Sequence, residues 1–165
     1  MLTGLVKVNS EICVACSRCV QACALEHSQS KSMFEAIAED PPPRPRVKLH
    51  EVGGSCVPTE CRHCEAAACA LVCPTGAMVK MGLGGPVVVD DKLCIGCRSC
   101  VLTCPYGVPE AYLQGEQITK CDLCIDRLRE DRIPACAESC PTGALEFAPS
   151  ADPEKPREFT PWRNL

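Results

Sequence analysis

The spacing of the cysteines constrains this chain more than any other feature of its sequence. Among 165 residues there are 17 cysteines, and sixteen of them fall into four groups of four, with only Cys56 outside the pattern. Proline directly follows the last cysteine in three of the groups. Such an internal repeat sets the architecture, because each copy is expected to fold in a similar way. The groups are Cys13-Cys16-Cys19-Cys23, Cys61-Cys64-Cys69-Cys73, Cys94-Cys97-Cys100-Cys104 and Cys121-Cys124-Cys136-Cys140.

The first and third groups read C-x2-C-x2-C-x3-C, the run that holds 4Fe-4S clusters in bacterial ferredoxins. A cubane cluster presents iron at four corners, and a loop with two-residue gaps can wrap three of them. The fourth cysteine then lies one helical turn further on and points toward a second cluster. A following proline ends that helix, because it lacks an N–H. The repeat therefore predicts four 4Fe-4S clusters.

Two other uses of cysteine compete with this interpretation. A cysteine density this high is typical of secreted disulfide scaffolds, and C-x2-C pairs are ordinary zinc ligands. A structural zinc ion needs two such pairs, whereas the groups here are triplets with a detached fourth member. The fourfold repeat favours iron–sulfur clusters over both alternatives.

The linker between the second and third groups indicates how the groups pair. Residues 82–85 are rich in glycine and residues 86–90 are mostly β-branched, so the linker is expected to form a β-hairpin. Groups two and three then form an inner module, inserted into an outer module built by groups one and four. In each module, the fourth cysteine of one group completes the cluster of the other. The predicted ligand sets are Cys13, Cys16, Cys19 and Cys140; Cys121, Cys124, Cys136 and Cys23; Cys61, Cys64, Cys69 and Cys104; and Cys94, Cys97, Cys100 and Cys73.

The predicted fold class is α+β, with two pseudo-symmetric double-cluster modules of bacterial ferredoxin type, one inserted in the other. The outer module covers residues 1–55 and 110–147, and the inner module covers residues 56–109. Short strands are expected at 5–8, 46–52, 117–120 and 144–147, and helices at 20–26, 66–72 and 99–103. An amphipathic helix is expected within 121–132.

Two stretches carry no predicted ligand and are expected to be extended and on the surface. They are residues 28–57 and the irregular, proline-rich C-terminal arm, residues 148–165. The arm contains Phe159 and Trp162, residue types that often anchor interfaces. A docking arm and plain disorder both remain open for it.

Charge and hydropathy exclude several classes of protein. The net charge of −4 and the pI of about 5.4 argue against nucleic acid as a partner, since such proteins carry a basic surface. The longest clear apolar run, residues 66–73, is far shorter than the roughly 18 residues of a membrane span. The N-terminal residues contain no export signal, so a cytoplasmic, reducing compartment is the expected location. Export in company with a signal-bearing partner remains open.

The residues outside the cysteine groups show no catalytic motif. There is no C-x3-C-x2-C triplet of radical-SAM enzymes, no dinucleotide-binding glycine pattern and no phosphate-binding loop. An enzyme is therefore not expected, and four closely spaced clusters favour the transfer of single electrons. Cys56 is interpreted as a buried small hydrophobe rather than a reactive thiol.

The histidines are expected to lie at the surface or beside a cluster rather than to bind iron, because thiolates account for every cluster corner, and basic residues beside the cysteine runs are candidates for screening the cluster charge. His63 lies between Cys61 and Cys64 and could donate a hydrogen bond to a sulfur. The other candidates for supporting roles are His27, His50, Arg18, Arg62, Arg98 and Lys120; ordinary solvated charge is an equally good interpretation of each basic residue.

Three stretches, PTECRHCEAAACALVCPTGAM, CIGCRSCVLTCPYGVP and KCDLCIDRLREDRIPACAESCPTGALEF, carry a family resemblance. They resemble the four-cluster electron-transfer subunits of molybdenum and tungsten oxidoreductases such as dimethyl sulfoxide reductase and formate dehydrogenase. The resemblance implies four 4Fe-4S clusters, the pairing given above and a large catalytic partner subunit. One departure is Ala24, which stands where proline often follows the fourth cysteine. The small size makes the chain look most like the iron–sulfur subunit of a tungsten-dependent aldehyde oxidoreductase.

Other arrangements remain open at this point. The chain could be a free polyferredoxin, or a homopolymer of stacked copies that serves hydrogenase, carbon monoxide dehydrogenase or formate dehydrogenase. A flavin- or NAD-binding subunit is a further partner of the expected kind.

Overall fold

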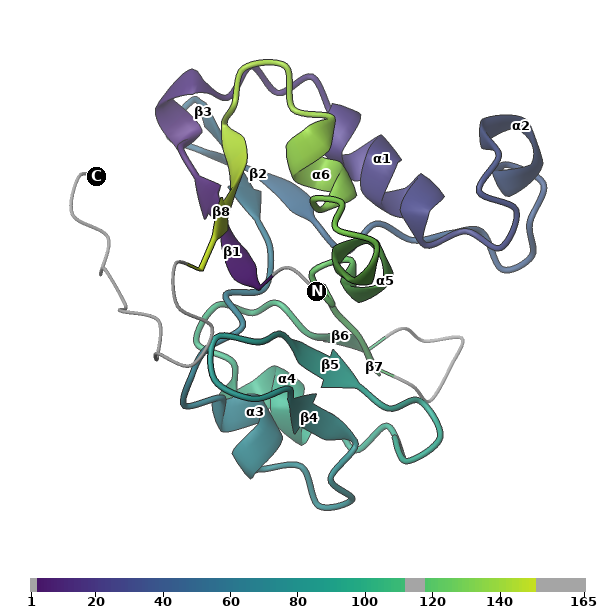
Figure 1. The fold of residues 1–165 in the computed structure, drawn as a ribbon, viewed down its shortest axis with the longest axis vertical. Coiled ribbons are helices and arrows are strands. Elements are labelled where there is room, and N and C mark those ends of the chain that lie inside the picture. The colour runs from purple at the N-terminus through teal and green to yellow at the C-terminus, as the bar shows by residue number, and fades with distance from the viewer. Residues whose placement is uncertain (1–2, 112–117, 151–165) are drawn as a thin grey trace.

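The computed structural model describes residues 3–111 and 118–150, and their elements gather in two bodies (Figure 1). Most of the predicted arm, with Phe159 and Trp162, lies outside these residues. The first body contains β1 (Gly4–Val8), α1 (Arg18–Glu26), α2 (Met33–Ala36), β2 (Lys48–Val52), β3 (Ser55–Thr59), α5 (Ile125–Arg129), α6 (Ala135–Glu138), β8 (Leu145–Pro149) and the 3-10 turn Ser10–Ile12. The second contains α3 (Ala68–Leu71), β4 (Met78–Lys80), β5 (Val87–Val89), α4 (Ser99–Thr103), β6 (Glu110–Ala111) and β7 (Ile118–Thr119). The class is α+β, as predicted.

Within the described ranges the strands pair into four two-stranded antiparallel sheets. Strands β1 and β8 bring distant parts of the chain together, with Val8 opposite Leu145. The predicted hairpin between the second and third cysteine groups is confirmed, since Met78 pairs with Val89 across β4 and β5. Its turn contains glycine at 82 with φ of 68°, a value that non-glycine residues rarely adopt.

Four helices, α1, α3, α4 and α6, each contain the third cysteine of a group, and proline limits the length of three of them. Helices α3, α4 and α6 end before the prolines at 74, 105 and 141. Helix α1 instead continues through Ala24 to Glu26, because alanine keeps the N–H that proline lacks. The departure at Ala24 therefore lengthens this helix by about one turn.

The expectation that residues 28–57 are extended and exposed is wrong at helix α2 and at the buried residues Ser28, Ala36 and Val47, whereas strand β3 is extended as expected. Helix α2 forms within them and buries Ala36, and Glu39 holds the preceding loop by accepting hydrogen bonds from the N–H groups of Gln29 and Ser30. Strand β3 also forms, pairing Pro58 with Leu49 of β2. A proline is compatible with this strand because β3 has a neighbour on one side only. Similarly, β8 extends to Pro149, so the first residues of the predicted arm belong to a sheet.

The described residues form two hydrophobic cores, one in each body, and cysteine contributes to both. The first contains Leu123, Leu128, Leu145 and Phe147 together with Cys19, Cys23 and Cys136. The second is smaller and contains Ala67, Met78, Val87, Ile118 and Cys100. Aromatic side chains are scarce in both cores, so the buried cysteines provide an important share of the packing in each.

Candidate metal centres

Two hollows are each lined by four cysteines from one of the predicted ligand sets. The first hollow has the set Cys13, Cys16, Cys19 and Cys140. The second has the set Cys73, Cys94, Cys97 and Cys100. As far as the described residues define them, neither lining includes a carboxylate or an imidazole. Four soft sulfur ligands around one space fit a 4Fe-4S cluster.

The third predicted set also lies together, in the second body. Burial raises the pKa of Cys69, and the nearby Cys61 and Cys104 raise it further. Cys64 has the same pattern, with burial, Cys61 and Cys104 all raising its pKa. Helices α3 and α4, which pack against each other, hold Cys69 near Cys104.

The fourth predicted set is the most enclosed, since Cys23, Cys121, Cys124 and Cys136 are all buried. Burial raises the pKa of Cys124 to about 12. It also raises the pKa of Cys136 well above the ordinary value, and the nearby Cys124 and Cys23 raise it further. Four thiolates crowded away from water would be unfavourable without positive charge between them, so their placement favours a bound metal cluster whose iron ions supply that charge.

Each cysteine loop turns in the same way. The residue before the second cysteine has a positive φ in all four groups, at Ala15, His63, Gly96 and Leu123. This turn points backbone N–H groups inward, and the N–H of His63 donates to Cys61 Sγ at 3.4 Å. The N–H of Leu123 donates to Cys121 Sγ at the same distance. Such concave N–H arrangements suit an anionic centre such as a thiolate-ligated cluster.

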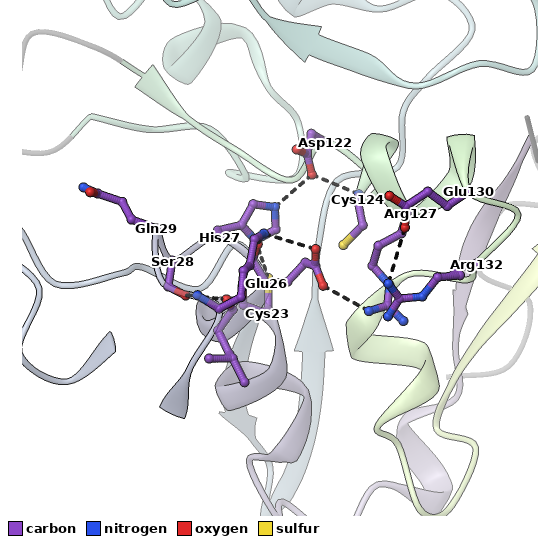
Figure 2. A network of polar contacts seen from close by, with 12 residues as sticks. Cys23, Glu26, His27, Ser28, Gln29, Asp122, Cys124, Arg127, Glu130 and Arg132 are labelled. Atoms are coloured by element: carbon purple, nitrogen blue, oxygen red, sulfur yellow. Dashed lines mark hydrogen bonds and ion pairs between the residues drawn. The ribbon is translucent and has the colours of Figure 1, made fainter. Parts of the chain in front are cut away.

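Cys23 and Cys124 of the fourth set lie in a network of polar contacts (Figure 2). His27 Nδ1 lies 2.7 Å from the carbonyl oxygen of Cys23, and His27 Nε2 lies 3.1 Å from Asp122 Oδ1. Both neighbours are acceptors, so both ring nitrogens carry hydrogen. Although burial alone would lower it, the hydrogen bond to Asp122 raises the pKa of His27 to about 9. The N–H of Arg46 donates to Cys23 Sγ at 3.1 Å.

Among the described residues, His27, Asp122 and Cys124 place possible ligand atoms within 4.8 Å of one another. The hydrogen bonds of His27 and Asp122 indicate that these two residues support the cysteines rather than bind a metal ion themselves. Asp122 accepts from the N–H of Cys124 at 2.9 Å and pairs with Arg46 at 2.6 Å. The predicted supporting role of His27 agrees with these contacts, whereas Asp122 was missed, because an acidic residue beside a cysteine carries no recognisable sequence signal.

A second ion-pair network joins the helices around this set. Arg127 of α5 pairs with Glu26 of α1 at 3.0 Å and also with Glu138 of α6. The Arg127 side chain is only 6% exposed, and its Nε donates to the carbonyl oxygen of Ile133 at 2.7 Å. These contacts fix α1 and α6, which carry Cys23 and Cys136, relative to each other.

Several other sequence predictions can be compared with the structure. The predicted contact of His63 with a sulfur is confirmed, since its Nε2 lies 3.7 Å from Cys121 Sγ. Lys120 is buried rather than solvated. The expectation of a buried Cys56 is wrong: this thiol is half-buried on β3, and burial together with the neighbouring Cys13 raises its pKa. Strand β3 packs beside the Ser10–Ile12 turn, which explains why Cys56 lies near the first group.

These hollows define the class of the molecule as an iron–sulfur protein, and comparisons with known proteins agree. Residues 52–150 match the 4Fe-4S dicluster domain family. An iron–sulfur protein of Rhodospirillum rubrum is 39% identical over 155 residues, covering 87% of this chain and 80% of that protein. One of the chains of the anaerobic dimethyl sulfoxide reductase of Escherichia coli is 39% identical over 147 residues, covering 86% and 71%. One of the subunits of the sulfite dehydrogenase of Allochromatium vinosum is 35% identical over 166 residues, covering 89% and 69%.

The chain thus belongs to the 4Fe-4S dicluster domain family. It is an iron–sulfur electron-transfer protein that holds 4Fe-4S clusters, and it is not a catalytic subunit. In residues 3–111 and 118–150, no helix has the length and apolar character that crossing a membrane requires.

Proposed function

We propose that this chain is a relay subunit with four 4Fe-4S clusters, and that it passes single electrons between a large catalytic oxidoreductase subunit and an acceptor or donor. The clusters supply one-electron redox chemistry when bound. The gathering of sixteen cysteines into four sets of four is the observation that carries the proposal.

The helices support a definite order of the four sets. Helix α1 carries Cys19 of the first set and Cys23 of the fully buried set, about one helical turn or 6 Å apart along the axis. Helix α4 likewise carries Cys100, with Cys104 of the other set directly at its end. Between the bodies, Cys121 lies near Cys61: burial raises the pKa of Cys121, and the neighbouring Cys61 raises it further.

The proposed relay therefore runs through four sets in a line. It begins at the set of Cys13, Cys16, Cys19 and Cys140. It continues through the set of Cys23, Cys121, Cys124 and Cys136 and then the set of Cys61, Cys64, Cys69 and Cys104. It ends at the set of Cys73, Cys94, Cys97 and Cys100.

The two ends of this line are the natural places for electrons to enter and leave. Each terminal set has one exposed cysteine, Cys16 at one end and Cys97 at the other, whereas the two middle sets have none. The apolar side chains of Val14 and Ile95 lie beside these cysteines, 63% and 60% exposed. Partners can therefore approach the terminal clusters closely, while the protein shields the middle pair.

Packing suggests limits for the two proposed modules. Strand β3 pairs with β2 of the first body, and Ile118 of β7 packs in the core of the second. We therefore propose an inner module of about residues 60–120, slightly later in the chain than residues 56–109. An outer module would hold the remaining described residues.

The relatives favour a catalytic partner of the reductase or dehydrogenase kind, since two of them are named as components of such enzymes. We propose a molybdenum or tungsten enzyme as this partner, with a tungsten-dependent aldehyde oxidoreductase as the specific candidate. A cytoplasmic, reducing environment is part of the proposal, because the cluster ligands must stay as thiolates.

Metal analysis and cysteine variants test this function. The protein purified anaerobically with its bound partner should contain about sixteen iron atoms and as many sulfides per chain. Molybdenum or tungsten in the same preparation would support the proposed partner. The Cys97→Ser variant should change the electron paramagnetic resonance signal of one cluster and leave three intact, while Cys56→Ser should retain all four. Zinc in place of iron, or equal iron loss in Cys56→Ser, would contradict the proposal.

A further inference from the structure

One histidine joins the two bodies through a contact with sulfur. His63 belongs to the loop between Cys61 and Cys64 in the second body, yet its Nε2 lies 3.7 Å from Cys121 Sγ, 58 positions later in the chain. The side chain is only 1% exposed, so water does not compete for this contact. The ring therefore bridges the ligand loop of one middle set and a ligand of the other.

The position of the ring proton follows from the second nitrogen. The backbone N–H of Val87 donates to His63 Nδ1 at 3.0 Å. A backbone N–H can only donate, so Nδ1 must be the acceptor and carry no hydrogen. In the neutral ring the hydrogen then sits on Nε2, where it points at Cys121 Sγ. The fold thus sets the tautomer in which His63 donates to sulfur.

Val87 of strand β5, which donates to His63, also accepts a hydrogen bond from a buried lysine. Lys120 is 3% exposed, and its ammonium group donates to the carbonyl oxygens of Val87 and Cys121, the latter at 2.6 Å. Its positive charge acts on Cys69 and favours the thiolate there. Val87 therefore holds His63 through its N–H and Lys120 through its carbonyl group.

We propose that His63 is a positioning residue of the relay. His63 raises the reduction potential of the cluster held by Cys121, and it couples that cluster to the one held by Cys61. The inference rests on the proposed function. An N–H donor at a cluster sulfur stabilises the more negative, reduced state, and more strongly in a buried site than in water. One electron passes from one cluster to the other, so one is oxidised and the other reduced by one electron. No bond breaks, and the proton stays on Nε2.

The His63→Phe variant tests this inference, because phenylalanine keeps an aromatic ring but has no donor. The variant should keep its full iron content. A redox titration monitored by electron paramagnetic resonance should show a lower potential for one cluster and unchanged potentials for the other three. The matched control is His50→Phe, an exposed histidine of β2, which should leave all four potentials unchanged. Glutamine at position 63 can accept from Val87 and donate to sulfur, so His63→Gln should restore most of the shift.

The outcomes separate this inference from the proposed function. Four intact cluster signals with unaltered potentials in His63→Phe would overturn the role of His63 alone, whereas a native protein without clusters would overturn both proposals. If His63→Phe loses iron, a second experiment tests the contact between His63 and the cluster. It applies pulsed electron paramagnetic resonance to protein with 15N-labelled histidine and with intact His63. The His27→Gln substitution removes the other histidine that contacts a cluster cysteine. Coupling of a histidine nitrogen to one reduced cluster is expected there, and its absence would contradict the contact.

Discussion

At the level of single residues, the positive φ before the second cysteine is the most repeated feature of the structure. Glycine meets this requirement at position 96, with φ of 66°, while alanine adopts φ of 54° at the corresponding position 15. A left-handed conformation costs a residue with a Cβ roughly 1 kcal/mol. The loop of the first group therefore stores strain that the loop of the third group avoids.

Exchanging these two residues tests that difference. The Ala15→Gly variant should be as stable as the wild type or more so, and Gly96→Ala should be destabilised by about 1 kcal/mol. Thermal unfolding of the iron-loaded protein under anaerobic conditions measures both effects. Equal destabilisation by the two substitutions would mean that φ does not limit these loops.

At the level of the elements, a single buried arginine fixes the helices around the enclosed set. Replacing Arg127 by methionine preserves much of the side-chain length, and it leaves Glu26 and Glu138 without their shared partner. Because Glu26 keeps Lys31 as a partner and Glu138 is 55% exposed, the lost contacts of Arg127 are expected to destabilise the protein by about 2 kcal/mol. The control is Arg129→Met, because Arg129 and its partner Asp126 are 56% and 84% exposed and contribute well under 1 kcal/mol.

Thermal unfolding and iron retention of the two arginine variants give the comparison. Arg127→Met should unfold at a clearly lower temperature and lose iron sooner, while Arg129→Met should resemble the wild type. Similar behaviour of both variants would contradict a structural role for the Arg127 network.

The length of α1 gives a second test at this level. Ala24→Pro restores the proline that follows the last cysteine in the other groups, but it removes an N–H from the interior of α1 and should cost about 3 kcal/mol. The end of the helix carries His27, so its contacts with Cys23 and Asp122 should be lost as well. The control Ala24→Ser keeps the N–H and should cost about 0.5 kcal/mol. Circular dichroism and thermal unfolding distinguish the two variants, and tolerance of proline would mean that α1 can end early.

At the level of the whole molecule, the described elements are too short to stabilise themselves. The longest helix has 9 residues, and the strands have between 2 and 5. A two-stranded sheet alone is at most marginally stable in water. The cores also contain several of the cysteines, so the clusters should supply much of the packing.

Removing the iron should therefore unfold the chain. Treatment with a chelator and an oxidant is expected to bleach the visible absorption and abolish the far-ultraviolet circular dichroism together. The two signals should decay at the same rate if metal binding and folding are one process. A native-like dichroism spectrum after complete loss of iron would show that the polypeptide holds the fold by itself.

Much of this organisation could be predicted from spacing alone. The gaps between cysteines restrict which sulfurs can reach one centre, and prolines at 74, 105 and 141 limit the helices locally. The helix at Ser99–Thr103 and the hairpin between the inner groups follow from such local signals. Helix α2 was missed because it is a single turn of four residues, and the contacts of Glu39 with Gln29 and Ser30 hold the loop before it. Strand β3 was missed although a local signal precedes it: the Gly-Gly pair at 53–54 is a two-residue turn that joins β3 to β2.

What the sequence by itself determined is the chemistry: sixteen thiols in four repeated groups, with no catalytic motif beside them. Only the tertiary structure decided which groups surround those thiols. His63 reaches Cys121 across 58 positions, Lys120 becomes buried, and Asp122 binds His27 at 3.1 Å. The physical reason is that spacing acts along the backbone, over a few residues. Burial and hydrogen bonding depend on segments that meet only when the chain folds.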